Sequence, residues 1–262
     1  MAGPVSVQVV RGAGTGPGGP SGLRVWEVRL DRPRAANALS AALVEQLHAV
    51  LDDVVREAPD VVVLRGNERH FAAGLDLAGL PDESDATLAH RFLRIGLLLE
   101  RWQAAPCLTA AVVRGHAVGA GADLALACDH RIGTPTARLR FPGPRFGVVL
   151  GTRRLVALAG TDAARQAVAG AGFDAVEAHA RGLLTEVSSG SEGPDGPDPA
   201  VARAVEAWAG VAPEARRPLL AQLRPPTDDA ALAALARSVA VPGLRDRVAA
   251  HAGNVSTHQE ER

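Results

Sequence analysis

The stretch Gly115-His116-Ala117-Val118-Gly119-Ala120-Gly121-Ala122-Asp123-Leu124 decides how this chain folds and what it can do. It follows a mostly apolar run at residues 108–113, which predicts a buried strand, and it leads into a predicted helix at about residues 121–127. Small residues let a ligand approach the backbone, and the first amides of a helix have no partner within it. We therefore expect the amide of Ala120 to be open to a ligand oxygen, with Asp123 beside it as an acid or base.

A second stretch has similar features. Phe71-Ala72-Ala73-Gly74-Leu75-Asp76-Leu77 follows another short apolar run, residues 61–64. A helix is expected to begin near Gly74, so the amide of Ala73 is a second candidate donor, and the helix dipole would add positive charge there. Two amides that meet on one oxygen form an oxyanion hole, and loss of one such donor typically costs about 2.7–4 kcal/mol of transition-state stabilisation. Taken alone, this stretch also fits a plain strand–helix turn that binds no ligand.

Composition narrows the class of protein. The chain has 262 residues, a net charge of −1, 47% apolar and 22% charged residues, which is typical of a globular protein. The balanced charge predicts no nucleic-acid partner, and the short apolar runs predict no membrane partner. No secretory signal is recognised, and the two cysteines, Cys107 and Cys128, lie in apolar surroundings. We therefore expect no disulfide framework and a cytoplasmic location.

Missing residue types exclude several mechanisms. The sequence contains neither lysine nor tyrosine. A Walker A phosphate loop, a Schiff-base lysine and a Ser-x-x-Lys nucleophile are therefore excluded. The eight histidines follow no metal-binding spacing, so no metal site is expected. The chain also lacks a Gly-x-Ser-x-Gly elbow, which argues against an esterase.

Alternating patterns place the chain in the α/β class with parallel strands. Residues 23–30 and 130–132 are predicted strands, Ser40 is predicted to cap a helix, and residues 87–103 follow a helical period. Past residue 161 the chain becomes helical, with further helices near residues 201–209 and 230–239. The expected organisation is a flexible N-terminus (1–20), a core (21–187), a linker (188–199), a helical C-terminal region (200–253) and a disordered tail (254–262).

Both opening stretches resemble signatures of the crotonase (enoyl-CoA hydratase/isomerase) superfamily. The first is similar to F-x-A-G-x-D-L, and residues 115–129 are similar to G-x-A-x-G-x-G-x-E-L-A-x-x-C-D, with Asp123 at the acidic position. Residues 31–39 look like the early R-P-x-x-x-N-A-L turn of that family. The resemblance covers about residues 25–187. It implies a spiral of ββα units with a helical C-terminal part used in trimer contacts, and a homotrimer or hexamer.

The resemblance also implies a ligand and its contacts. The ligand would be an acyl-CoA thioester whose carbonyl is held by the amides of Ala73 and Ala120. Coenzyme A would be part of the substrate, and no separate cofactor is expected. The adenine end of coenzyme A would contact the backbone near Ala36 and at residues 73–76, which are Ala73, Gly74, Leu75 and Asp76. Arg34 is either a partner for a coenzyme A phosphate or a solvated charge of the turn.

Two departures from the family pattern concern the acid/base groups. Hydratases of this family place two glutamates around one water, and the first falls at Asp123, whose side chain is shorter by one methylene. The second belongs to a stretch similar to F-x-x-P-E-x-R-x-G, where this chain has Arg140-Phe141-Pro142-Gly143-Pro144-Arg145-Phe146-Gly147. The glutamate position is Gly143 in one register and Arg145 in the other. Neither supplies a carboxylate, and Gly143 is taken as the position of the missing group.

Three other polar residues near the signatures are interpreted structurally. His116 is given a structural role, although an imidazole there could titrate near neutral pH. Asp76 is interpreted as a helix N-terminal charge rather than a catalyst. Asp129 is expected to end a helix or to pair with Arg131.

The sequence leaves three functional hypotheses. The first is an enoyl-CoA hydratase/isomerase-like enzyme that stabilises a thioester enolate, with Asp123 as its acid/base. The second is a catalytically weakened acyl-CoA-binding or accessory protein without hydratase activity. The third is a subunit that works only beside a partner enzyme.

Overall fold

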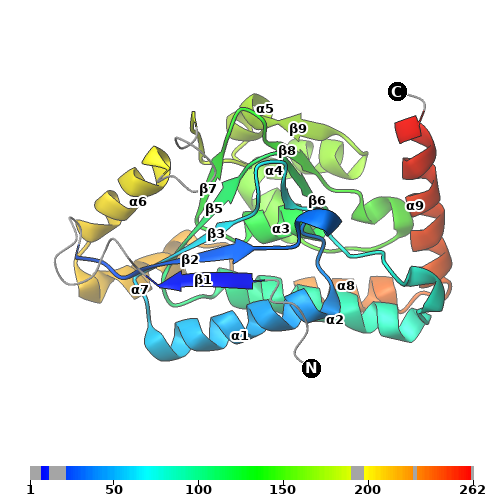
Figure 1. Ribbon diagram of the computed structural model, residues 1–262, viewed down its shortest axis with the longest axis horizontal. Coiled ribbons are helices and arrows are strands. Elements are labelled where there is room, and N and C mark those ends of the chain that lie inside the picture. Colours follow the sequence, from blue (N-terminus) through cyan, green and yellow to red (C-terminus); the bar gives the residue numbers. More distant parts are fainter. Residues whose placement is uncertain (1–6, 12–21, 190–197, 227–228, 261–262) are drawn as a thin grey trace.

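A computed structural model describes residues 7–11, 22–189, 198–226 and 229–260, with side chains described for Val9 and, within these ranges, for residues 22–253. Two sheets form its centre (Figure 1). In the first sheet β1 is antiparallel to β2 and the remaining pairs are parallel. Its strands, in spatial order, are β1 (Val7–Arg11), β2 (Val25–Leu30), β3 (Val61–Arg65), β5 (Leu108–Val113), β7 (His130–Gly133) and β10 (Glu186–Val187). The second sheet contains β4 (His70–Ala72), β6 (His116–Val118), β8 (Arg138–Arg140) and β9 (Gly172–Asp174).

The chain winds through both sheets in repeated ββα units, which confirms the expected spiral. Strands β3, β5 and β7 each add to the first sheet, and the strand that follows each of them, β4, β6 or β8, adds to the second. A helix closes each unit: α2 (Asp85–Gln103), α3 (Ala120–Leu126) and α4 (Thr152–Val168). The repetition places the β–α junctions of successive units side by side.

Helices cover both faces of the first sheet, so its central strands are buried throughout. Alternate side chains of β3, such as Val62 and Leu64, pack with α1 (Ala41–Glu57), whose first turn is capped by Ser40 Oγ accepting from the Leu43 amide at 3.2 Å. The other side chains, such as Val61, pack with α6 (Pro199–Ala209) and α7 (Pro213–Leu223). This division confirms the prediction that the apolar run at residues 61–64 is a strand buried on two faces.

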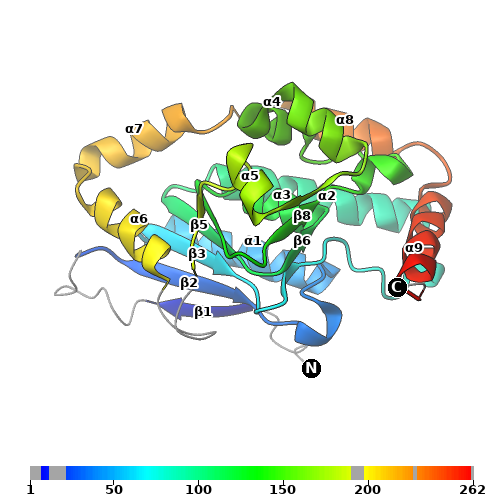
Figure 2. The same cartoon turned by 90° about the horizontal axis from the view of Figure 1, so that it is seen from above.

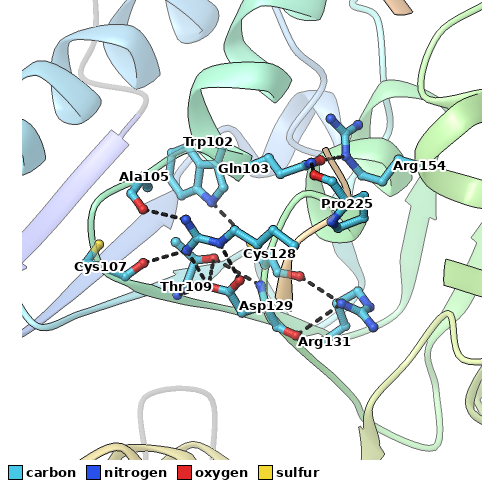
Figure 3. Close-up of polar contacts among 11 residues, drawn as sticks. Trp102, Gln103, Ala105, Cys107, Thr109, Cys128, Asp129, Arg131, Arg154 and Pro225 are labelled. Atoms are coloured by element: carbon cyan, nitrogen blue, oxygen red, sulfur yellow. Dashed lines mark hydrogen bonds and ion pairs between the residues drawn. The ribbon is translucent and has the colours of Figure 1, made fainter. Parts of the chain in front are cut away.

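The helical C-terminal part returns to the core at two ends. Figure 2 shows α6 and α7 at one end of the molecule and α9 (Leu244–Glu260) at the other, with α8 (Asp229–Val239) between them. Arg224, just after α7, donates from Nε and Nη2 to the two carboxylate oxygens of Asp129, both at 2.7 Å. The same guanidinium reaches the carbonyls of Ala105 and Cys107, at 2.6 and 2.8 Å, beside Asp129 (Figure 3).

This contact corrects the expectation for Asp129. Its carboxylate pairs with Arg224 rather than Arg131, and it also accepts from the amide and hydroxyl of Thr109. Arg131 instead donates to the backbone carbonyl of Asp129 at 3.1 Å (Figure 3). The two cysteines of this region, Cys107 and Cys128, are free and buried, and burial raises the pKa of each thiol to about 12.

Three local predictions differ from the structure. No helix begins near Gly74: its φ of +84° and a bridge between Leu39 and Leu75 keep the segment extended until the short turn Leu80–Asp82. Residues 7–11 of the expected flexible N-terminus form β1 against β2, with Val9 on the core. Helix α9 runs to Glu260, through most of the expected disordered tail. The central part of the expected linker, residues 190–197, lies outside the described residues, as do 1–6 and 12–21.

One close backbone contact sets the distance between α3 and β4. A Cβ added at Gly121 would lie 2.2 Å from the carbonyl oxygen of Ala72, closer than any normal contact. The start of α3 can therefore lie against the end of β4 only because residue 121 has no side chain. The same contact brings residues 73–75 next to Ala120.

Gly121→Ala is expected to lower the free energy of unfolding by about 2–4 kcal/mol, since the new methyl group meets backbone atoms that cannot rotate away. Urea unfolding followed by tryptophan fluorescence measures this change. The matched control is Gly253→Ala, where an added Cβ meets nothing within 4 Å. That helical substitution is expected to be neutral or stabilising by up to about 1 kcal/mol. Equal effects at the two positions would contradict the packing argument.

Candidate functional site

A cavity of about 460 Å³ lies where the ββα junctions meet. Its walls come from the segment after β4, the start of α3, the turn η3 (Gly143–Phe146), the start of α4 and one face of α9. Most of the lining is apolar. The lining includes Ala73, Gly74, Leu75, Ala120, Asp123, Gly143, Phe146, Val248 and His251.

Among the backbone amides of this cavity that have no acceptor within the described residues are those of Leu75 and Ala120. They lie close together, because an ideal Cβ on Gly74 would be 3.4 Å from the Ala120 nitrogen. The amide of Ala73, which the sequence predicted as the first donor, is not open, because it donates to the carbonyl of Ala36 at 3.0 Å. That amide is already used by the fold, and the amide two residues later is the one left open.

A polar turn fixes the segment that carries Leu75. The buried Asn37 donates to the carbonyls of His70 and Phe71, at 3.0 and 3.2 Å, and its side-chain oxygen accepts from the Arg32 amide at 2.9 Å. Arg32 in turn forms an ion pair with Asp76 at 2.8 Å. The Asp76 carboxylate also accepts from the Ala78 amide, so its side chain is used to hold the turn, although no helix starts there.

Asp123 lies in the first turn of α3 and is 4% exposed. Its carboxylate has no hydrogen-bond partner among the described residues, and it packs on Gly151, the residue that caps α4. A Cβ at Gly151 would fall 1.9 Å from Asp123 Oδ1, so only glycine leaves room for this carboxylate. Burial raises the pKa of Asp123 from 3.8 to about 7, against an opposing effect of the Arg154 charge.

Arg154 carries the positive charge that acts on Asp123. It is 6% exposed, its Nη2 lies 3.0 Å from a carboxylate oxygen of Glu100, and its Nε donates to the side chain of Gln103 (Figure 3). Gln103 donates onward to the carbonyl of Pro225 at 2.6 Å. These groups line a second cavity of about 420 Å³. Because Arg154 already forms an ion pair with Glu100, its charge only partly opposes the rise in the pKa of Asp123 that desolvation causes.

Gly143, which occupies the position where the family has its second carboxylate, forms part of the cavity wall. Gly143 lines the cavity, and its own carbonyl accepts from the Val148 amide at 3.0 Å. Arg145, the alternative register, reaches the carbonyl of Ala169 at 3.4 Å and does not line the cavity. No carboxylate of the described residues therefore joins Asp123 in the lining.

Helix α9 closes the cavity opposite the β–α junctions, a feature that the sequence reasoning missed. Val248, His251 and Ala252 line the cavity, and the ring of His251 lies 5.1 Å from that of Phe146. The sequence carries a signal for the helix itself but not for its position at the cavity, because Leu244, Val248 and His251 follow a helical period directly after Pro242 and Gly243.

The other predicted residues lie outside the cavity. Arg34 is exposed on the turn η1 (Pro33–Ala35), and Ala36 follows it with a left-handed φ of +49°. His116 is exposed on β6, with its ring 5.9 Å from that of His70. Within the described part of the chain no cluster of side chains could hold a metal ion. Over the same residues, no helix is long and apolar enough to cross a membrane.

The fold and the cavity define a protein of the crotonase type: a ββα spiral with open amides and a buried carboxyl at the junction of successive units. Comparison with known proteins agrees, since the family model "Enoyl-CoA hydratase/isomerase" matches residues 22–237. The chain therefore belongs to the enoyl-CoA hydratase/isomerase family, within the crotonase superfamily.

Relatives named for enoyl-CoA chemistry align with part of the chain. The enoyl-CoA isomerase/hydratase fer4 of Mycosarcoma maydis is 32% identical over 181 residues, 64% of this chain and 66% of the relative. The 2,3-dehydroadipyl-CoA hydratase of Escherichia coli K12 is 35% identical over 170 residues, 63% of this chain and 66% of the relative. The match thus spans just under two thirds of each of these relatives. A crystal structure from Bordetella parapertussis, assigned to enoyl-CoA hydratase/isomerase, superposes with a TM-score of 0.82 at 36% identity and covers 94% of this chain and 98% of its own.

The raised pKa of Asp123 makes stability depend on pH. The folded protein keeps this proton up to about pH 7, whereas the unfolded chain releases it near pH 3.8. Between these values the folded state binds more protons, so the contribution of Asp123 to the free energy of unfolding falls as pH rises. Asp123→Asn has no proton to lose and is therefore expected to be more stable than the wild type at pH 8, by roughly 4 kcal/mol at most.

Urea unfolding of the two proteins at pH 8 and pH 4 measures this difference. The expected stabilisation of the variant shrinks to about 0.6 kcal/mol at pH 4, where Asp123 is protonated in the folded state and partly protonated in the unfolded chain. A stabilisation of the same size at both pH values would mean that the substitution acts through packing and not through the buried charge.

Proposed function

We propose that the protein binds an acyl-CoA thioester and moves protons beside its carbonyl, as an enoyl-CoA hydratase/isomerase. The observation that carries this proposal is the placement of two open amides, Leu75 and Ala120, in one cavity with the carboxyl of Asp123. Family membership and relatives named for enoyl-CoA chemistry support it.

The thioester oxygen would accept from both amides. As a proton leaves the α-carbon, electrons move onto this oxygen, and donors already aimed at it stabilise the resulting enolate without reorganising. Leu75 takes the role expected for Ala73, since the Ala73 amide is bonded to Ala36. The apolar lining keeps water away from these bonds, which strengthens them.

Asp123 would be the base for proton transfer. With a pKa of about 7, it is ionised in a substantial fraction of molecules near neutral pH and returns a proton readily. In a double-bond isomerisation the carboxylate takes a proton from the α-carbon of a 3-enoyl thioester, and the electron pair of the broken bond extends the conjugation to the oxygen. The same proton is then returned to the γ-carbon, so one carboxyl is enough for this reaction.

The remainder of the substrate would lie along the turn beside the cavity. Arg34 is exposed there and carries no ion pair within the described residues, so it remains a candidate partner for a coenzyme A phosphate. Backbone near Ala36 and at residues 73–76 is the proposed contact for the adenine end. Coenzyme A is then part of the substrate, with no separate cofactor or metal, and a homotrimer or hexamer is the proposed assembly.

A second candidate function is an acyl-CoA-binding or accessory protein without hydratase activity. The absence of a carboxylate at Gly143 favours it, because hydration needs one group for the proton of water and one for the proton that reaches the α-carbon. Binding without turnover of any thioester would be its signature.

The test follows crotonyl-CoA hydration and 3-hexenoyl-CoA isomerisation in the wild type and in Asp123→Asn. Both rates are expected to fall about 100-fold in the variant, since proton transfer by a placed side chain contributes about 10²–10⁴-fold. The matched control is Asp162→Asn, whose side chain is 87% exposed on α4. Equal rates for the wild type and Asp123→Asn would remove Asp123 from the mechanism. Thioester binding without any turnover would favour the accessory protein instead.

A further inference from the structure

The cavity contains a second titratable side chain. Among the described residues that line it, only Asp123 and His251 can gain or lose a proton near neutral pH. They come from elements far apart in the sequence, α3 and α9, and they enter the same space. An apolar cavity with two such groups has the minimum that a two-proton reaction needs.

The imidazole of His251 lies beside the turn in which the carboxylate is missing. Its ring packs on that of Phe146, with centroids 5.1 Å apart and planes inclined at 43°. One turn earlier on α9, Arg247 Nε donates to the Phe146 carbonyl at 3.1 Å. Phe146 is the last residue of η3, and Gly143 is the first. His251 therefore lines the cavity next to the turn that contains Gly143.

Helix α9 is fixed firmly enough to place this ring. The Asp85 carboxylate, in the first turn of α2, accepts from the amides of Gly243 and Arg245 at 2.7 and 2.8 Å, which holds the N-terminus of α9. Leu244 and Val248 on the same side of the helix are buried against α2 and η2 (Leu80–Asp82). A side chain carried on an anchored helix needs little reorganisation to act on a bound substrate.

We propose that His251 is the second acid/base of the site and supplies the proton that reaches the α-carbon when water is added to a 2-enoyl thioester. The proposal rests on the function proposed above. It assigns to an imidazole from the C-terminal helix the proton that no carboxylate at residue 143 can give. Asp123 then handles the proton of water.

The protons and electrons of this addition balance. The Asp123 carboxylate takes a proton from water as the water oxygen bonds to the β-carbon. The π electrons of the double bond move to the α-carbon and onto the thioester oxygen, held by Leu75 and Ala120. The enolate then reforms the carbonyl as the α-carbon takes a proton from the His251 imidazolium. Asp123 ends protonated and His251 neutral, and transfer of one proton between them through solvent restores the starting state.

The surroundings of His251 suit a proton donor. Burial and the nearby positive charge of Arg145 lower the pKa of its imidazole. A lowered pKa makes the imidazolium a stronger acid, and it also leaves a smaller fraction of the side chain protonated at neutral pH than in an unperturbed histidine. The ring is only partly buried, so it can be reprotonated from solvent after each turnover.

The experiment compares two reactions in the wild type and His251→Gln. Hydration of crotonyl-CoA needs both groups, whereas isomerisation of 3-hexenoyl-CoA needs Asp123 alone. In His251→Gln the kcat for hydration is expected to fall about 100-fold, while isomerisation and the Kd for crotonyl-CoA change less than about 3-fold. His90→Gln, an exposed histidine of α2 away from the cavity, is the matched control. It should leave both reactions unchanged.

A second pair of variants tests whether a carboxyl placed at residue 143 can replace His251. Gly143→Glu, made in the His251→Gln background, places a carboxyl at the cavity wall, where a Cβ would lie 3.2 Å from the Val148 carbonyl oxygen. It should recover hydration about 10-fold or more, and Gly143→Gln in the same background should not. Selective loss of hydration with this recovery supports the proposal.

Several outcomes overturn the proposal: hydration unchanged in His251→Gln, hydration and isomerisation lost to the same extent, or a wild type that isomerises but does not hydrate. The failure of the underlying function gives a different pattern. In that case the wild type itself turns over neither thioester, and both proposals fall together.

Discussion

The candidate site depends on one close approach, that of α3 to the end of β4 at Gly121 and Ala72. Because residue 121 has no side chain, the two backbones meet at a distance that any Cβ would prevent. This contact sets Leu75 and Ala120 side by side and leaves both amides without an acceptor in the described structure. The pair is therefore a consequence of the ββα spiral, which stacks one β–α junction on the next.

Burial then decides the chemistry of the acid beside these amides. Asp123 gains no hydrogen bond from the described residues in return for its lost hydration, and Arg154 shares its charge with Glu100, so the pKa of Asp123 rises to about 7. The same desolvation lowers stability at high pH and gives Asp123 the pKa that the proposed base needs near neutrality. The cost in stability and the proposed role thus have one physical cause.

Much of the fold could be predicted from sequence, because apolar periodicity marks strands such as residues 108–113 and Ser40 marks a helix start. The pattern of small residues also located the region of the site. Which amide is open could not be predicted, since it depends on the bond from Ala73 to Ala36 and on an extended segment after Gly74. The approach of α9 and His251 to the cavity is a tertiary contact across more than a hundred residues, and local propensity carries no information about it.

The most direct test of the central claim is the infrared carbonyl stretch of crotonyl-CoA, labelled with ¹³C at the thioester carbon, when it is bound to the protein. Two amides that donate to the thioester oxygen polarise the C=O bond and weaken it. The account predicts a band at lower frequency than that of the free thioester in water, both in the wild type and in Asp123→Asn, since the donors belong to the backbone. A band at the frequency of the free thioester, or above it, would contradict the claim that Leu75 and Ala120 hold the carbonyl.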